Sequence, residues 1–300
     1  MSFSFDTKCE ICESTLRKDC CKAAQFYGMI LFAQSIDSSR LKITTENVMT
    51  INVLNELANE VMGFNFTIGE NLNSYFAYVD EARLTKIYDK FFINVNNKIE
   101  LNISSSITES ICCSYAFLKG AFLTGGHISN PENSYHFEIS TPYYTLAKSL
   151  QSFMQRLDFS AKIVVRKSNY VVYLKSSEEI EQFLCHIGAN SAAFSFMDAK
   201  IYKEMNNYSN RINNTKLHNI ERTLNKSVEQ VKAINLIEST IGFDSLDSDL
   251  VFAAKLRKDN PDKSLNELVI VSDNKLSRSG LNRKLNKLMK IASELGDKNV

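Results

Sequence analysis

The C-terminal end of the chain concentrates side chains that bind anions. Six cations and no acidic residue occur between positions 275 and 290: Lys275, Arg278, Arg283, Lys284, Lys287 and Lys290. Such groups contact nucleic-acid phosphates, and arginine also pairs with guanine. Ser277, Ser279 and Asn282 add hydroxyl and amide groups that bond to phosphate or adenine. The combination predicts DNA binding, with a merely solvated basic helix as the alternative.

The spacing of leucines indicates the helix that would carry these groups. Leu281, Leu285 and Leu288 recur at helical intervals and define an apolar face. Ser277 or Ser279 is a suitable N-cap for this helix. The opposite, solvent face is expected to hold Ser279, Asn282, Arg283, Asn286, Lys287 and Lys290.

Two short helices are expected upstream, over 250–258 and 264–270, followed by a turn at 272–275. This order is that of a helix-turn-helix, whose last helix reads the major groove. We therefore expect an all-α domain over 241–300, with the motif itself at about 263–296. Base edges would be read by Arg278, Ser279, Asn282 and Arg283. Phosphates would be held by Lys275, Lys284, Lys287 and Lys290.

The net charge of +1 hides an asymmetry along the chain. Residues 1–199 carry 17 basic and 21 acidic side chains, whereas residues 200–300 carry 18 and 13. This charge distribution predicts an acidic body that carries a basic, anion-binding end. Between the two parts, 206–240 reads as a polar helical linker or a second nucleic-acid contact surface, with Arg211 and Arg222 as its DNA-binding residues.

The acidic body contains an internal repeat. Residues 20–36 align without a gap on residues 112–128, and six of the seventeen positions are identical. Both copies read as buried helices with a glycine in the middle, Gly28 and Gly120. A mid-helix glycine costs about 1 kcal/mol relative to alanine, so we expect the two helices to approach closely there. Two copies indicate a duplicated half-domain.

Matching patterns after each helix extend the duplication. Each half is expected to continue with a strand, a helix, a hairpin and a further helix. The halves span about 15–95 and 107–195, within a domain over 1–205. The predicted fold class is therefore α+β for this domain, followed by the all-α helix-turn-helix domain.

The segment 118–128, LKGAFLTGGHI, resembles the LAGLIDADG helix of homing endonucleases in a duplicated, single-chain form. In homing endonucleases, the end of each of these two helices carries an acidic residue that binds divalent metal for phosphodiester hydrolysis. The resemblance implies that this chain would need acidic residues at the same two positions to act as a nuclease. The corresponding positions here are Ala33 and Gly125, which cannot bind metal. Asp37 and Glu132 are out of register with each other. We therefore expect a nuclease-like scaffold without metal, cofactor or enzymatic activity.

Three features together resemble the WhiA family of Gram-positive bacteria: the paired LAGLIDADG-like helices, the polar stretch from Asn210 to Thr223, and the segment 276–282, LSRSGLN. The resemblance implies a sequence-specific DNA-binding regulator of cell division and chromosome segregation, and of sporulation in some relatives. Arg222 stands where a lysine is more usual, which keeps a phosphate-binding charge with different geometry.

Two other functions stay open at this point. One is a metal-dependent nuclease that recruits ligands from elsewhere in the domain. The other is a protein-interaction module that does not bind DNA. For the favoured reading we expect duplex DNA as partner, a protein partner at the LAGLIDADG-like domain, and a nucleoid-associated, cytoplasmic location.

The remaining sequence features exclude several classes of protein. No run of 18 apolar residues occurs, and the first residues lack the apolar core of a signal peptide. Seven cysteines without an export signal are expected to be reduced thiols. Cys9 and Cys12 have a zinc-like spacing but lack a second pair at finger spacing. The doubled cysteines are interpreted as small buried hydrophobic residues: Cys20, Cys21, Cys112 and Cys113.

Overall fold

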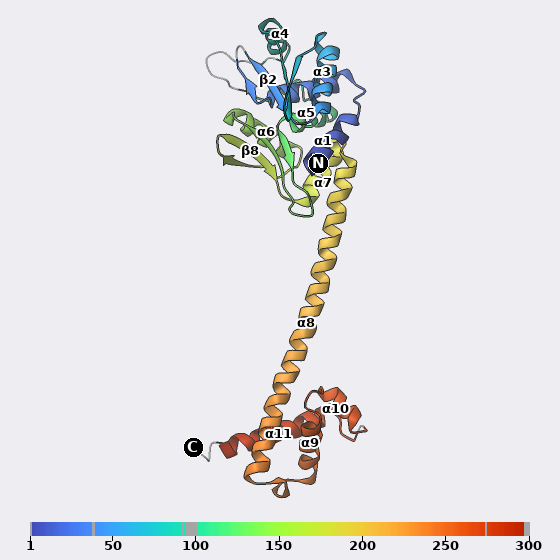
Figure 1. Cartoon of the computed structure of the whole chain (residues 1–300), viewed down its shortest axis with the longest axis vertical. Coiled ribbons are helices and arrows are strands. Elements are labelled where there is room, and N and C mark those ends of the chain that lie inside the picture. Colours follow the sequence, from blue (N-terminus) through green and yellow to red (C-terminus); the bar gives the residue numbers. More distant parts are fainter. Residues whose placement is uncertain (1, 38–39, 92, 94–100, 274, 297–300) are drawn as a thin grey trace. The chain divides into compact units, whose positions relative to one another are not determined.

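A computed structural model of the chain describes residues 2–37, 40–91, 93, 101–273 and 275–296. It divides into two compact units, Met1–Lys203 (unit 1) and Glu204–Val300 (unit 2), whose elements are labelled in Figure 1. Over the described ranges, no helix has both the length and the apolar character required to cross a membrane. Asn274, in the predicted turn, and residues 297–300 of the predicted domain lie outside the described residues.

Unit 1 contains the same order of elements twice, after a first helix, α1 (Phe3–Glu13). The first repeat comprises α2 (Asp19–Leu31), β1 (Ser35–Ile36), β2 (Leu41–Thr45), α3 (Val48–Met62), β3 (Thr67–Asn71), β4 (Ser74–Tyr78) and α4 (Glu81–Phe91). The second comprises α5 (Ile111–Gly125), β5 (Gly126–Ile128), β6 (Phe137–Thr141), α6 (Tyr144–Arg156), β7 (Lys162–Arg166), β8 (Asn169–Leu174) and α7 (Ser177–Ile187).

Each repeat folds into a four-stranded antiparallel sheet, in the orders β1-β2-β4-β3 and β5-β6-β8-β7. Buried residues pair at equivalent places: Ile43 lies opposite Ala77, and Ile139 opposite Val172. Helices α3 and α6 pack on these two sheets. The predicted α+β duplication is therefore confirmed. The sequence pattern missed α1, β1 and β5, and the two strands are too short to show a period of two.

The two repeats meet along α2 and α5, where the paired glycines remove the barrier to close approach. A Cβ atom on Gly28 would lie 2.2 Å from the carbonyl oxygen of Phe117. A Cβ atom on Gly120 would lie 2.0 Å from the carbonyl oxygen of Gln25. Both obstacles are backbone atoms of the other helix, so no side-chain rearrangement would relieve them. The predicted close approach is confirmed.

Unit 2 is helical. Helix α8 (Asn190–Thr240) continues into it and is followed by a 3₁₀ turn, η1 (Phe243–Ser245), and by α9 (Ser248–Asp259), α10 (Leu265–Val271) and α11 (Arg278–Gly296). Its core combines Leu250, Leu268, Leu281, Leu285 and Leu288 with Ile234 and Ile237 from α8.

The segment predicted as a linker, 206–240, lies entirely within α8. It is exposed up to residue 222, as its polar sequence indicates. Further along, Ser227, Gln230, Ile234 and Ile237 are buried in unit 2. The second half of this segment therefore belongs to the core of unit 2, because an isoleucine pair at i and i+3 supplies an apolar stripe to it.

Candidate nucleic-acid interface

The basic helix α11 begins as the sequence indicates. The Ser277 hydroxyl accepts the backbone N–H of Gly280 at 3.1 Å, which satisfies one of the unpaired amides of the first turn. Ser277 is therefore the cap, and Ser279 lies within the first turn, exposed, with its hydroxyl 3.2 Å from that of Ser277.

The two faces of α11 are divided as predicted except at Asn282, which was expected on the solvent face but is half-buried, with its Oδ1 atom buried. Leu281, Leu285 and Leu288 are buried in the core of unit 2. Arg283 and Lys290 are exposed, together with Lys275, Arg278, Ser279 and Lys287. The buried leucines fix the orientation of α11 on the core of unit 2. The exposed cationic and hydroxyl side chains therefore point away from this core. Their contact with DNA stays a prediction.

Two of the predicted phosphate contacts have acidic partners that the sequence reading overlooked. Lys284 forms an ion pair with Asp249, at the start of α9. The Lys287 Nζ atom lies 3.7 Å from Asp247 Oδ2. Both carboxylates are exposed, so each pair is weak in water. A phosphate would have to compete with these carboxylates for the two ammonium groups.

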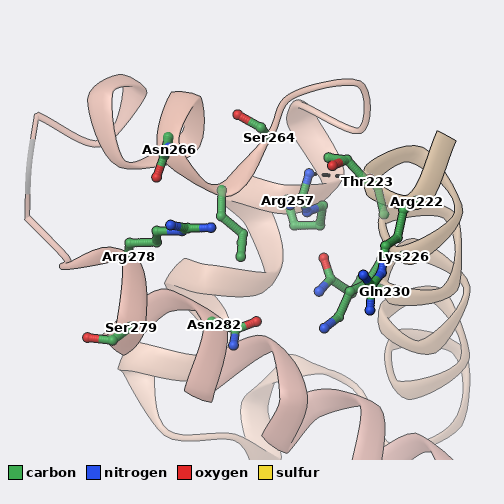
Figure 2. A pocket seen from close by; sticks show the side chains of 12 residues that line it. Arg222, Thr223, Lys226, Gln230, Arg257, Ser264, Asn266, Arg278, Ser279 and Asn282 are labelled. Carbon is green, nitrogen blue, oxygen red and sulfur yellow. Dashed lines mark hydrogen bonds between the residues drawn. The ribbon is translucent and has the colours of Figure 1, made fainter. Parts of the chain in front are cut away.

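A cavity of about 550 Å³ lies beside the start of α11, bounded by side chains from α8, α9, α10 and α11 (Figure 2). Four cationic residues line it, and none of the lining residues that the structure describes is acidic. The cationic residues are Arg222, Lys226, Arg257 and Arg278. Thr223, Ser264, Asn266 and Ser279 add neutral hydrogen-bonding groups. Unopposed positive charge in a concave, polar site favours an anion.

Arg257 is the structural centre of this cavity. It is only 2% exposed, and Nη1 donates hydrogen bonds to the Lys263 carbonyl at 2.6 Å, the Ser227 hydroxyl at 3.3 Å and the Asn260 carbonyl at 3.4 Å. Burial lowers the pKa of this guanidinium below its ordinary value. No carboxylate lies among these three partners, so the charge of Arg257 adds to the positive potential of the cavity.

Three polar atoms at the cavity lack a hydrogen-bond partner within the described part of the chain: Arg257 Nε, Gln230 Oε1 and Asn282 Oδ1. Buried polar groups are rarely left unpaired in folded proteins, so these atoms indicate a place that a ligand or water completes. Sequence reasoning identified Asn282 but missed Gln230 and Arg257. One signal in the sequence could have identified Arg257. It follows Leu250 by seven residues, which places a cation on the apolar face of α9.

The two arginines predicted on the polar stretch have different surroundings. Arg222 and Lys226 are one turn apart on α8 and both line the cavity (Figure 2). Arg211 is exposed and lies eleven residues before Arg222, about 16 Å along the helix. The structure therefore brings Arg222 to the start of α11 and leaves Arg211 outside this site.

Replacing Arg257 by alanine is expected to lower the local free energy of unfolding of unit 2 by about 2–3 kcal/mol, because it leaves buried carbonyls unpaired. Lys258→Ala is the matched control, since it removes only the exposed ion pair with Glu238 and should cost less than about 1 kcal/mol. Hydrogen exchange of the α9 amides measures both changes. Equal protection in the two variants would show that Arg257 does not stabilise the unit.

The ends of α2 and α5, where a homing endonuclease would hold metal, carry a different set of residues. A cavity of about 350 Å³ there is lined by Ala33, Gln34, Thr124, Gly125 and His127, among others, and none of its described lining residues is acidic. The Gln34 side chain makes two hydrogen bonds with the backbone of Thr44. Nε2 donates to the Thr44 carbonyl at 2.6 Å, and Oε1 accepts the Thr44 N–H at 2.5 Å. Burial lowers the pKa of His127. The described lining offers no carboxylate pair for a divalent ion.

Comparison with known proteins agrees with this geometry. A family model described as the WhiA LAGLIDADG-like domain matches residues 114–206, and one described as the WhiA C-terminal HTH domain matches residues 209–292. A protein of Ruminiclostridium cellulolyticum named "Probable cell division protein WhiA" is 34% identical, over 100% of this chain and 99% of the relative. The chain belongs to the WhiA family.

Other members of the WhiA family show the same extent of similarity. The "Probable cell division protein WhiA" of Caldicellulosiruptor saccharolyticus is 36% identical, over 98% of this chain and 96% of the relative. A solved structure, "full-length DUF199/WhiA from Thermatoga maritima", has a TM-score of 0.54 and 23% identity, covering 98% of this chain and 99% of that chain. The WhiA fold, a LAGLIDADG-like domain followed by a helix-turn-helix domain, is therefore the fold of this chain.

Proposed function

We propose that this chain is a non-enzymatic, sequence-specific DNA-binding protein that acts as a regulator of cell division and chromosome segregation. The observation that carries the proposal is the cationic cavity beside the capped start of α11. Arg222 and Lys226 line it together with Arg278, Ser279 and Asn282, which supports phosphate contacts beside the base-reading residues, and its described lining contains no acid. The named cell division relatives support the cellular process.

We assign base contacts and phosphate contacts to different residues of the site according to the helix on which each residue lies. The first turns of a reading helix approach base edges, so the residues that would contact bases are Arg278, Ser279, Asn282 and Arg283. Arg222 and Lys226 lie on a separate helix and would hold a phosphate of the backbone that borders the groove. The cavity between them, with Arg257 at its base, would fix the register of α11 on the duplex.

The absence of enzymatic activity is part of the same proposal. Phosphodiester hydrolysis by this scaffold needs carboxylates that hold divalent ions at the helix ends. Ala33 and Gly125 occupy the ends of the two helices, and the glutamine and histidine beside them are neutral groups. Unit 1 would then serve as a surface for a protein partner, and the protein would be found with the nucleoid.

Removing an acidic competitor should strengthen binding. Asp249→Asn is expected to raise the affinity for duplex DNA by roughly threefold to tenfold, because it frees Lys284 and removes a charge that repels phosphate. Asp259→Asn makes the same charge change at the far end of α9 and should have a smaller effect. Fluorescence anisotropy with a labelled duplex measures both. Equal gains would mean that net charge alone is responsible.

Sequence-specific binding is tested by mapping the DNA that is recovered with the protein from cells. The proposal predicts enrichment at discrete sites that share a short motif, near genes whose products act in division or segregation. An Arg278→Ala/Asn282→Ala variant should lose this enrichment while keeping weak, uniform binding. Uniform recovery of the genome by the unchanged protein would contradict sequence-specific recognition.

A further inference from the structure

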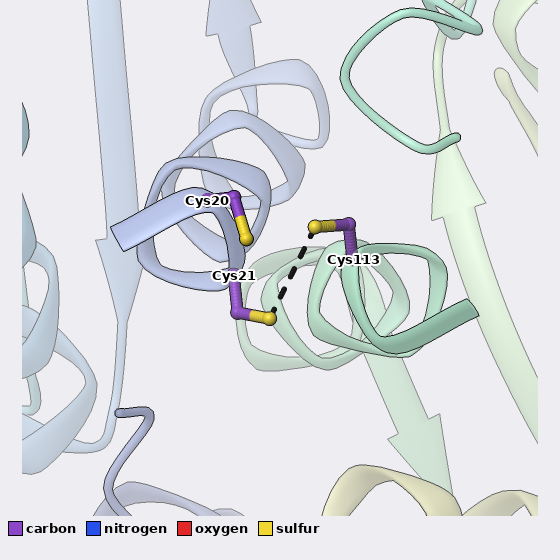
Figure 3. A group of neighbouring side chains, drawn as sticks. All are labelled: Cys20, Cys21 and Cys113. Carbon is purple, nitrogen blue, oxygen red and sulfur yellow. Dashed lines mark hydrogen bonds between the residues drawn. The ribbon is translucent and has the colours of Figure 1, made fainter. Parts of the chain in front are cut away.

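The repeat brings two pairs of cysteines to one place in unit 1. Cys20 and Cys21 lie in the first turn of α2, and Cys112 and Cys113 lie in the first turn of α5. The two helices pack against each other, so the pairs meet across the boundary between the repeats. Figure 3 shows Cys20 and Cys21 on one helix and Cys113 on the other, with the sulfur atoms directed toward one another. All four are free thiols.

The distances between the sulfur atoms are those of a metal-binding site. The Sγ atoms of Cys20, Cys21 and Cys113 all lie within 4.8 Å of one another, and those of Cys21 and Cys113 are 4.0 Å apart. In a tetrahedral site with Zn–S bonds of about 2.3 Å, two sulfur ligands are about 3.8 Å apart. Three thiols therefore need only small side-chain rotations to bind one ion.

Cys112 is placed to complete the set. Cys21 interacts with both thiols of the second pair, and Cys113 interacts with both thiols of the first. The Cys112 sulfur lies 3.4 Å from the Ser110 hydroxyl and lies on the same helix turn as Cys113. The structure brings three of these sulfur atoms together, and rotation of the Cys112 side chain toward them would give four sulfur donors, two from each repeat, which is the ligand set of a closed structural zinc site.

Burial raises the pKa of the Cys21 and Cys113 thiols, and the ends of both helices act in the opposite direction, toward the thiolate form that a metal requires. Lys18 and Ser110 are the N-cap residues of α2 and α5, and neither makes a side-chain capping hydrogen bond. The first-turn amides of both helices are therefore free of side-chain caps, and the positive ends of two helix dipoles converge on the cysteines. A thiolate at a helix N-terminus is stabilised by this arrangement.

Hydrophobic packing accounts for only part of the cluster. Cys21 and Cys113 are 5% and 4% exposed, which fits the interpretation of these residues as small apolar side chains. Cys20 is exposed, so that interpretation is wrong for it. An exposed thiol directed at two buried thiols has no packing function, but it is a suitable ligand at the rim of a metal site.

We propose that Cys20, Cys21, Cys112 and Cys113 form a tetrathiolate site for one soft divalent cation of the zinc class. Four protein ligands leave no open coordination position, so the ion is structural. It joins the first turns of α2 and α5 and holds the two repeats together at the opposite end from the ends that lack carboxylates. This site is independent of the DNA-binding surface in unit 2.

Cobalt titration of the full chain tests the site directly. The protein is freed of metal under a thiol-free reductant and titrated with Co²⁺ alone. We expect the visible absorption of tetrahedral, thiolate-bound cobalt, saturating at about one ion per chain and displaced by Zn²⁺. Zn²⁺ should also raise the melting temperature of the metal-free protein, because it binds only the folded state.

Two substitutions and a control decide which thiols bind the ion. Cys20→Ser changes an exposed side chain, so the fold is retained, and it should weaken cobalt binding on the order of tenfold or more. Cys113→Ala should remove the absorption. Cys185→Ser, an exposed cysteine on α7, is the matched control and should leave the titration unchanged. The Cys20→Ser result stands even where Cys113→Ala fails to fold.

The proposal is overturned by any of three results. The first is that the wild-type chain does not develop the tetrahedral cobalt absorption. The second is that Cys20→Ser titrates with cobalt in the same way as wild type. The third is that mass spectrometry of the metal-free chain finds a Cys21–Cys113 disulfide that forms in preference to cobalt binding.

Discussion

Replacing both Arg222 and Arg278 by alanine is expected to weaken binding to duplex DNA by about 100-fold at physiological salt. Each arginine lines the cavity beside the reading helix, and a lost contact of this kind costs about 1–3 kcal/mol, where 1.4 kcal/mol is tenfold in affinity. The logarithm of affinity should also fall less steeply with the logarithm of salt concentration, by about one, because the phosphate that Arg222 would hold is no longer neutralised. Anisotropy titrations at several salt concentrations measure both effects.

Lys216→Ala is the matched control for this double variant. Lys216 is an exposed cation on α8, outside the cavity lining, so it should change affinity by less than roughly twofold. Arg211→Ala provides a second comparison, because Arg211 is a predicted DNA-binding residue that lies outside the cavity lining. An equal loss in Lys216→Ala and in the double variant would remove the cavity from the binding surface.

The second large effect is expected in unit 1. Gly120→Ala places a Cβ atom 2.0 Å from the Gln25 carbonyl oxygen, so α2 and α5 must separate along their whole contact. Overpacking of a core costs about 1–3 kcal/mol and more where backbone must move. We expect a loss of about 3 kcal/mol or failure of unit 1 to fold, measured by hydrogen exchange of the α2 and α5 amides.

The same substitution at Gly280 separates this steric effect from helix propensity. A Cβ atom on Gly280 would meet the Ser277 hydroxyl at 3.1 Å and no other described atom within 4 Å, so this hydroxyl would have to shift by only a few tenths of an ångström and could still cap α11. Gly280→Ala should therefore be neutral or stabilise α11 by up to about 1 kcal/mol. Comparable losses in the two variants would contradict the requirement for glycine at the helix pair.

The sequence was most informative where a pattern recurs. The repeat predicted the close approach at Gly28 and Gly120, and the leucine spacing predicted the buried face of α11. Short elements gave no such signal: β1 has two residues, and β5 begins at the glycine that follows α5. Such strands are fixed by pairing with β2 and β6 rather than by their own composition.

The parts of the site that sequence reasoning missed depend on contacts between distant residues. Arg257 lies on the apolar face of α9 because the Lys263 carbonyl and the Ser227 hydroxyl accept its hydrogen bonds, and Ser227 is 30 residues away. The carboxylate of Asp249 reaches Lys284 across 35 residues. The doubled cysteines were interpreted one helix at a time, whereas their meeting follows only from the packing of α2 against α5.

We propose above that this WhiA-family chain binds duplex DNA without cutting it. Supercoiled plasmid incubated with the full chain and Mg²⁺ or Mn²⁺, and run on agarose before and after removal of the protein, tests both parts of the claim. We predict a salt-sensitive shift before removal and fully supercoiled plasmid afterwards. Nicked or linear plasmid that requires the metal, or the absence of any shift at low salt, would contradict the claim.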